Sequence, residues 1–200
     1  METMIKNSTV ETQGFKDLPD NVKGNLSDFD DCPLDILADY IQYKHHRFLK
    51  NKIPVISQKL EKLCLIHGME YLEIFEIAQL FNVSSGDLGI LMKKQELVLF
   101  PYIKVLVGSQ EIGKKVSKPF FETIIKPIQN IIYEHEKEKI RFKKILALMD
   151  SYELSANVGK SHIVTFAMLR EFENHLRSYI DIANNNLFPG AIELEREMVH

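Results

Sequence analysis

Apolar residues recur every three or four positions along almost the whole chain after Leu34, and this spacing is the strongest constraint on its fold. It places apolar side chains along one face of an α-helix. The strict alternation of apolar and polar residues that is typical of half-buried strands is absent. The sequence therefore predicts an all-α protein built as an up-and-down four-helix bundle with extra short helices.

The periodic segments predict helices over residues 34–52, 55–67, 70–81, 87–106, 120–152 and 161–187. Pro54 is expected to separate the first two of these helices, because proline breaks helix hydrogen bonding. A turn is expected over residues 82–86, with Ser84 or Ser85 capping the next helix. The stretch AIELEREM predicts a short final turn. Residues 1–31, polar and without periodicity, predict a flexible leader, and residues 32–200 predict the helical domain.

Charge and composition exclude several classes of protein. The formal net charge is −3 and the sequence pI is about 6.2, which argues against binding to nucleic acid or to an anionic membrane surface. No apolar run approaches the roughly 20 residues that span a bilayer, and the N-terminus lacks the apolar core of a secretory signal. The two cysteines make no disulfide framework. We expect a reduced, cytoplasmic protein with no nucleic-acid or membrane partner.

Histidines on the inner faces of the predicted helices are the candidate site residues. His135 follows Ile131 and Ile132 on an apolar stripe, His67 lies on another, and His45-His46 falls in mid-helix. A single histidine of this kind is most often a hydrogen-bonded core residue. Three such residues in one bundle also predict a metal site, because bundle interiors are where such sites are built. His162 and His175 are expected at the surface or at a helix cap.

A weak internal sequence repeat also indicates a site at the bundle centre. Leu99-Phe100-Pro101 recurs as Leu187-Phe188-Pro189, 88 residues later, and His46 and His135 lie 89 residues apart. Two helix hairpins related by a pseudo-twofold axis would share one central site. A repeat of only three residues is also compatible with coincidence.

Five stretches resemble the iron-sulfur cluster repair proteins that carry a hemerythrin-like di-iron domain. They are PLDILADYIQYKHHRFLKNKIP, LCLIHG, MKKQELVLFPYI, IIYEHEKE and FENHLRSYIDIANNNLFPGAIELE, and the resemblance covers residues 32–195. It implies a hemerythrin-like bundle, a di-iron cofactor and a role in restoring iron-sulfur clusters under nitrosative or oxidative stress.

The resemblance carries only part of the metal-ligand set. It aligns three of the family's seven ligands with His46, His67 and His135, although the helical stripe alone slightly favours His45 over His46. The two His-x-x-x-Glu motifs of the family are replaced here by Leu91 with Gln95 and by Tyr179 with Ala183. Glu96 is one residue beyond a lost ligand and is expected to point elsewhere, because one residue turns an α-helix by about 100°.

Three functional hypotheses follow. Iron needs anionic oxygen ligands to offset the cost of burying its charge, so loss of both glutamates predicts a metal-free, non-enzymatic bundle that acts as a binding or regulatory module. In that case the Tyr179 hydroxyl would lean onto a remaining histidine. The first alternative is one iron or zinc ion on His46, His67 and His135. The second is a di-iron repair protein with a non-standard ligand set. An iron-sulfur protein and a second copy of the chain are the possible partners.

Overall fold

The computed structural model describes residues 29, 31–68, 71–155 and 160–199. Most of the leader predicted over residues 1–31 therefore lies outside the described residues. Phe29 is described, and it is buried with its ring 5.2 Å from that of Tyr40. The packed core therefore includes a residue that precedes the predicted boundary at residue 32.

The described residues form four long helical rods, three of which contain a π-helical segment. The first rod is α1 (Leu34–Tyr40), η2 (Ile41–His46) and α2 (Arg47–His67), and the second is α3 (Leu72–Lys94), η3 (Gln95–Leu99) and α4 (Phe100–Glu111). The third rod is α5 (Ile125–Ser155). The fourth is α6 (Lys160–Ile182), η4 (Ala183–Leu187) and α7 (Phe188–Met198).

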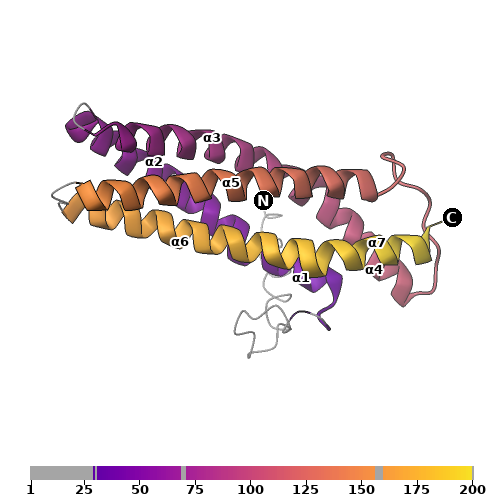
Figure 1. The fold of residues 1–200 in the computed structure, drawn as a ribbon. Coiled ribbons are helices and arrows are strands. Elements are labelled where there is room, and N and C mark those ends of the chain that lie inside the picture. Colours follow the sequence, from indigo (N-terminus) through magenta and orange to yellow (C-terminus); the bar gives the residue numbers. More distant parts are fainter. Residues whose placement is uncertain (1–28, 30, 69–70, 156–159, 200) are drawn as a thin grey trace, which may run out of the picture.

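These rods run alternately up and down, which confirms the predicted all-α bundle. Helix α2 packs against α3 and α6, and α5 also packs against α3 and α6, so the four form a closed bundle (Figure 1). At the other end of the molecule α4 packs against α1 and α7. Within the described ranges, the strand-like pairing is limited to an isolated bridge between Val116 and Val199.

Two predicted helix breaks are wrong. Pro54 lies inside α2 without ending it. Its side chain is exposed, so the carbonyl that loses its hydrogen-bond donor lies on the solvent side, where water can solvate it.

The predicted turn over residues 82–86 is also absent, since α3 runs straight through it. Ser85 Oγ donates to the carbonyl of Phe81, 2.8 Å away, and Ser84 Oγ donates to Glu138 Oε2 at 2.5 Å. Both hydroxyls are therefore satisfied inside a continuous helix and neither acts as a cap.

The predicted short final turn is instead the eleven-residue helix α7, which is fixed through Glu195. This carboxylate is buried and accepts hydrogen bonds from Tyr102 Oη at 3.0 Å, Thr123 Oγ1 at 2.6 Å and the backbone N–H of Ile124 at 2.9 Å. It thus satisfies one backbone donor, the N–H of Ile124, just before α5 begins, where a negative charge is favourable.

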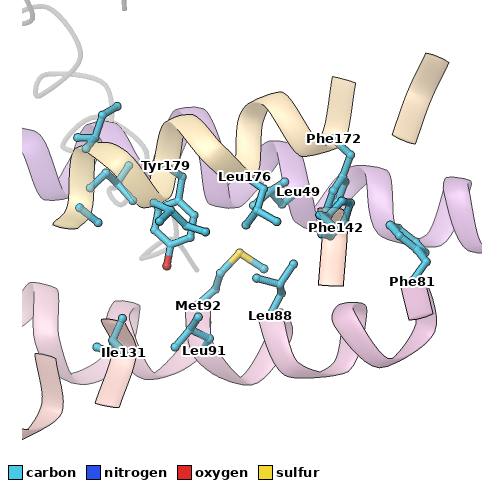
Figure 2. Packing of buried hydrophobic residues seen from close by; sticks show 14 of the residues in the cluster. Leu49, Phe81, Leu88, Leu91, Met92, Ile131, Phe142, Phe172, Leu176 and Tyr179 are labelled. Carbon is cyan, nitrogen blue, oxygen red and sulfur yellow. The ribbon is translucent and has the colours of Figure 1, made fainter. Parts of the chain in front are cut away.

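The core runs along the bundle axis towards the middle of the molecule. Phe142 and Phe172 stack with ring centroids 5.5 Å apart, and the ring of Phe81 contacts both edge-on. Leu88, Met92 and Leu176 continue the packing, and Tyr179 follows one turn beyond Leu176 (Figure 2). Among the described residues, no helix combines the length and apolar character needed to cross a membrane.

Candidate functional site

The three π-helical segments mark the candidate site at the bundle centre. His46 is the last residue of η2, Gln95 is the first of η3 and Ala183 is the first of η4. All three side chains are buried. π-Helical turns are rare and occur frequently at functional sites. Here they coincide with three positions at which the resemblance places a metal ligand.

The Tyr179 hydroxyl lies at the centre of this site. It accepts a hydrogen bond from Gln95 Nε2 and lies 2.7 Å from His135 Nε2. His135 Nδ1 lies 2.8 Å from Asn184 Oδ1, which can only accept, so Nδ1 donates there and Nε2 accepts the Tyr179 proton. Figure 2 shows the hydroxyl directed from α6 towards the helix that carries Leu91 and Met92. The expected contact between Tyr179 and a remaining histidine is present.

His46 faces the same centre from the other side. Its ring lies edge-on to Tyr179, with centroids 4.8 Å apart. Its Nδ1 donates to Glu96 Oε1 at 2.9 Å, and Lys50 Nζ binds Glu96 Oε2 at 2.5 Å. Glu96 therefore points to the outer nitrogen of His46 and not to the Tyr179 hydroxyl that Gln95 binds. His46 Nε2 and Gln95 Oε1 are both buried without a hydrogen-bond partner.

His46 and His135 have equivalent surroundings, which gives the internal sequence repeat a physical basis. Phe100 stacks on His46 with centroids 5.7 Å apart, and Phe188 stacks on His135 at 6.0 Å. Glu96 and Asn184, which hold the two Nδ1 atoms, are 88 residues apart, like the two phenylalanines. Reasoning from the sequence missed these four supporting residues. The Leu-Phe-Pro repeat was the sequence signal from which they could have been predicted.

His67 does not join the other two candidate ligands. It ends α2, 21 residues after His46 along the same rod, which is about 31 Å at 1.5 Å per residue. Its ring lies 4.6 Å from that of His162, and His162 Nε2 lies 2.8 Å from Tyr152 Oη. The three imidazoles predicted to share a metal therefore do not converge. His162 is buried in the first turn of α6, so of its two expected positions, the surface or a helix cap, the surface is wrong.

His45 and His46 are both buried, and they face different neighbours. The His45 ring lies 5.6 Å from Tyr40 and 5.5 Å from His175, while His175 stacks on Phe48. His46 is the one that meets Tyr179, in agreement with the alignment and against the slight preference of the helical stripe.

Burial keeps the centre neutral. It lowers the pKa of His135 to about 4, although the hydrogen bond that His135 donates to Asn184 opposes the shift. It also lowers the pKa of His46, against the opposing effect of Glu96, and it raises the pKa of the Tyr179 hydroxyl. At neutral pH the centre therefore contains two neutral imidazoles, a phenol and an amide.

Stability is expected to fall as the pH drops from 6.5 towards 4. The folded-state pKa of His135 is about 4 and that of His45 about 3, whereas an unfolded histidine titrates near 6.5. The unfolded chain therefore binds more protons in this window, and each such group contributes a loss of up to about 3 kcal/mol. Urea unfolding at a series of pH values from 7 to 5 measures the slope of the free energy of unfolding against pH. His135→Gln should reduce the slope by about one proton, and an unchanged slope would contradict a neutral buried His135.

The donor set does not fit a di-iron pair. Within the described residues no group of three or more His, Cys, Asp and Glu side chains is arranged to hold a metal ion. The carboxylate of Glu96 is held by His46 Nδ1 and Lys50, on the outer side of the imidazole. A histidine whose Nδ1 is held by an outer carboxylate or amide is typical of metal sites. The structure thus has the outer support of a metal site without the inner carboxylates that two iron ions require.

Comparison with known proteins finds distant relatives of this chain. No family model matches the sequence. An iron-sulfur cluster repair protein YtfE from Musicola paradisiaca is 25% identical over 164 residues, which cover 82% of this chain and 68% of the relative. Proteins of the same name from Enterobacter sp. strain 638 and Cronobacter sakazakii are 23% and 22% identical. Those matches cover 78% and 84% of this chain and 65% and 71% of the relatives. The chain is a distant homologue of the iron-sulfur cluster repair proteins.

Proposed function

We propose that this protein is a hemerythrin-like bundle that works without a di-iron pair, as a binding or regulatory module. The observation that carries the proposal is the Tyr179 hydroxyl, which bridges Gln95 and His135 where a repair protein of the family would need metal ligands. The names of its relatives suggest an iron-sulfur protein as the partner. The matches span about two thirds of the length of those relatives.

Electrostatics supports a metal-free centre. Two iron ions would bring at least four positive charges into a site where Gln95, His135 and Tyr179 are all buried and neutral. Burying such charge without anionic ligands is very costly. The hydrogen bonds among these side chains satisfy most of their polar atoms with no ion.

One observation favours a second candidate function, a site for a single metal ion. His46 Nε2 and Gln95 Oε1 are buried without partners, and both side chains contact Tyr179 or its ring. With His135 they could bind one iron or zinc ion if the Tyr179 side chain moved. This candidate predicts one ion per chain. Its ligands would be His46, Gln95 and His135, with Gln95 in the place that the three-histidine hypothesis gives to His67.

Unfolding in the presence and absence of metal tests the proposal. A metal that binds only the folded state at 100 times its dissociation constant adds about 2.7 kcal/mol of stability. We expect the wild-type protein to unfold at the same urea concentration with ferrous iron, zinc or a chelator.

His135→Ala should destabilise the protein equally in all three conditions, because its role is structural. Stabilisation by one metal that disappears in both His46→Ala and His135→Ala would instead support the single-ion site and contradict the metal-free proposal.

A further inference from the structure

A groove with a volume of about 790 Å³ lies between α3 and α5 on the surface of the bundle. Most of the residues that line it are apolar, and they include Leu91 and Ile131 from the core. Ile90 and Phe120 also line the groove, and 59% and 89% of their surfaces are exposed. An exposed apolar area with polar residues around it is typical of a surface that binds another molecule.

The charged side chains that line the groove balance one another. Asp87 and Glu134 are its acids, and Lys94 and Lys137 are its bases. Glu134 and Lys137 form an ion pair at 2.7 Å within α5, and Asp87 forms one with Arg141 at 2.8 Å. The total charge of the groove therefore favours neither an anionic nor a cationic molecule. The order of the charges along α3 is what distinguishes one kind of partner from another.

The order of side chains along α3 is complementary to itself. Asp87 and Lys94 lie seven residues apart, about two helical turns, and both line the groove together with Ile90 between them. If a second α3 lies antiparallel to the first with the two Ile90 side chains in contact, each Asp87 lies opposite Lys94 of the partner subunit. A twofold axis beside Ile90 forms both pairs at once, because every contact in such an interface occurs twice.

The apolar side chains match in the same arrangement. Because α3 and α5 run in opposite directions (Figure 1), Phe120, which precedes α5, lies at the η3 end of the groove with Val98. Val83 lies two turns before Ile90 on α3, and 48% of its surface is exposed. In the antiparallel arrangement Val83 lies opposite Val98 of the partner subunit, at the end of the groove that carries the exposed Phe120 ring. The twofold contact therefore covers apolar side chains along the whole groove.

We propose that a second copy of this chain docks on the groove between α3 and α5 and forms a twofold-symmetric dimer with antiparallel α3 helices. Ile90 of each subunit enters the groove of the other, as side chains do when helices pack into one another's grooves. Asp87 and Lys94 form two ion pairs across the interface, and this reciprocal charge order favours a second copy over a different protein. The dimer goes beyond the proposed function and does not depend on the metal content of the centre.

Sedimentation velocity of the purified full chain at low salt tests the dimer. We expect the mass to rise from 23.2 kDa towards twice that value between about 1 µM and about 1 mM protein, the range in which weak complexes form. Ile90→Lys should weaken association by at least about tenfold, because it places two ammonium groups together at the axis. Ile163→Lys, at a similarly exposed position on α6, should leave it unchanged. A wild-type chain that stays monomeric, or equal effects of the two variants, would overturn the proposal.

Charge reversal tests the antiparallel pairing itself. Asp87→Lys and Lys94→Asp should each weaken self-association by about tenfold, because each places like charges opposite one another at two points. Arg141 keeps its ion pair with Glu138 in Asp87→Lys, so we expect both variants to fold. Mixing them should restore association as a heterodimer, since one subunit then presents two acids to two bases of the other. Lys62→Asp, which reverses an exposed charge on α2, should not replace Lys94→Asp in this mixture. No association in the first mixture, or equal association in both, would contradict the assigned interface.

Discussion

Replacing Tyr179 with phenylalanine is expected to lower the free energy of unfolding by about 2–4 kcal/mol. The hydroxyl is the partner of Gln95 Nε2 and of His135 Nε2. Both partners are fully buried, and each buried polar atom left without a partner costs about 1–3 kcal/mol. The ring itself is kept, so the change measures the hydrogen bonds and not the packing.

Tyr133→Phe is the matched control for this substitution. Tyr133 lies on α5 with 65% of its surface exposed, and loss of its hydroxyl should change stability by less than about 0.5 kcal/mol. Urea unfolding followed by circular dichroism measures both variants. Equal stability of the two variants would show that the Tyr179 hydroxyl does not hold the centre together.

The combined variant Leu91→His, Gln95→Glu, Tyr179→His and Ala183→Glu is expected to gain about two iron ions per chain. The four wild-type side chains are all buried. With His46 and His135, the variant would have four imidazoles and two carboxylates around one centre. Carboxylates from two helices are what di-iron sites in bundles use to offset and bridge the metal charge.

Adding His135→Ala to this combined variant should lower the iron content, because His135 would be one of the ligands. Iron content by plasma mass spectrometry and folding by circular dichroism are both needed. A variant that folds and binds no iron would show that these helices are not in the register that the resemblance assigns.

The bundle could be predicted from the sequence because one periodic signal runs along nearly the whole chain. The helix breaks could not be predicted, since proline and serine act there through their surroundings. Pro54 faces solvent, and Ser84 donates a hydrogen bond to Glu138, which lies 54 residues later in the sequence on α5. Local propensity indicated a break in both places, and tertiary contacts outweighed it.

At the site, the resemblance located His46, His135 and the four replaced positions, and it correctly indicated that Tyr179 meets a histidine. It also aligned His67, which lies at the far end of α2. The contact between Glu96 and His46 could not be predicted from the sequence, because it joins residues that are 50 positions apart on two different rods.

The metal content of the purified, untagged protein, expressed with ample iron, tests the central claim most directly. Plasma mass spectrometry should find almost no iron, zinc or copper per chain, because the neutral network around Tyr179 occupies the centre. About two irons per chain would contradict the account and would indicate ligands that the present arrangement does not supply.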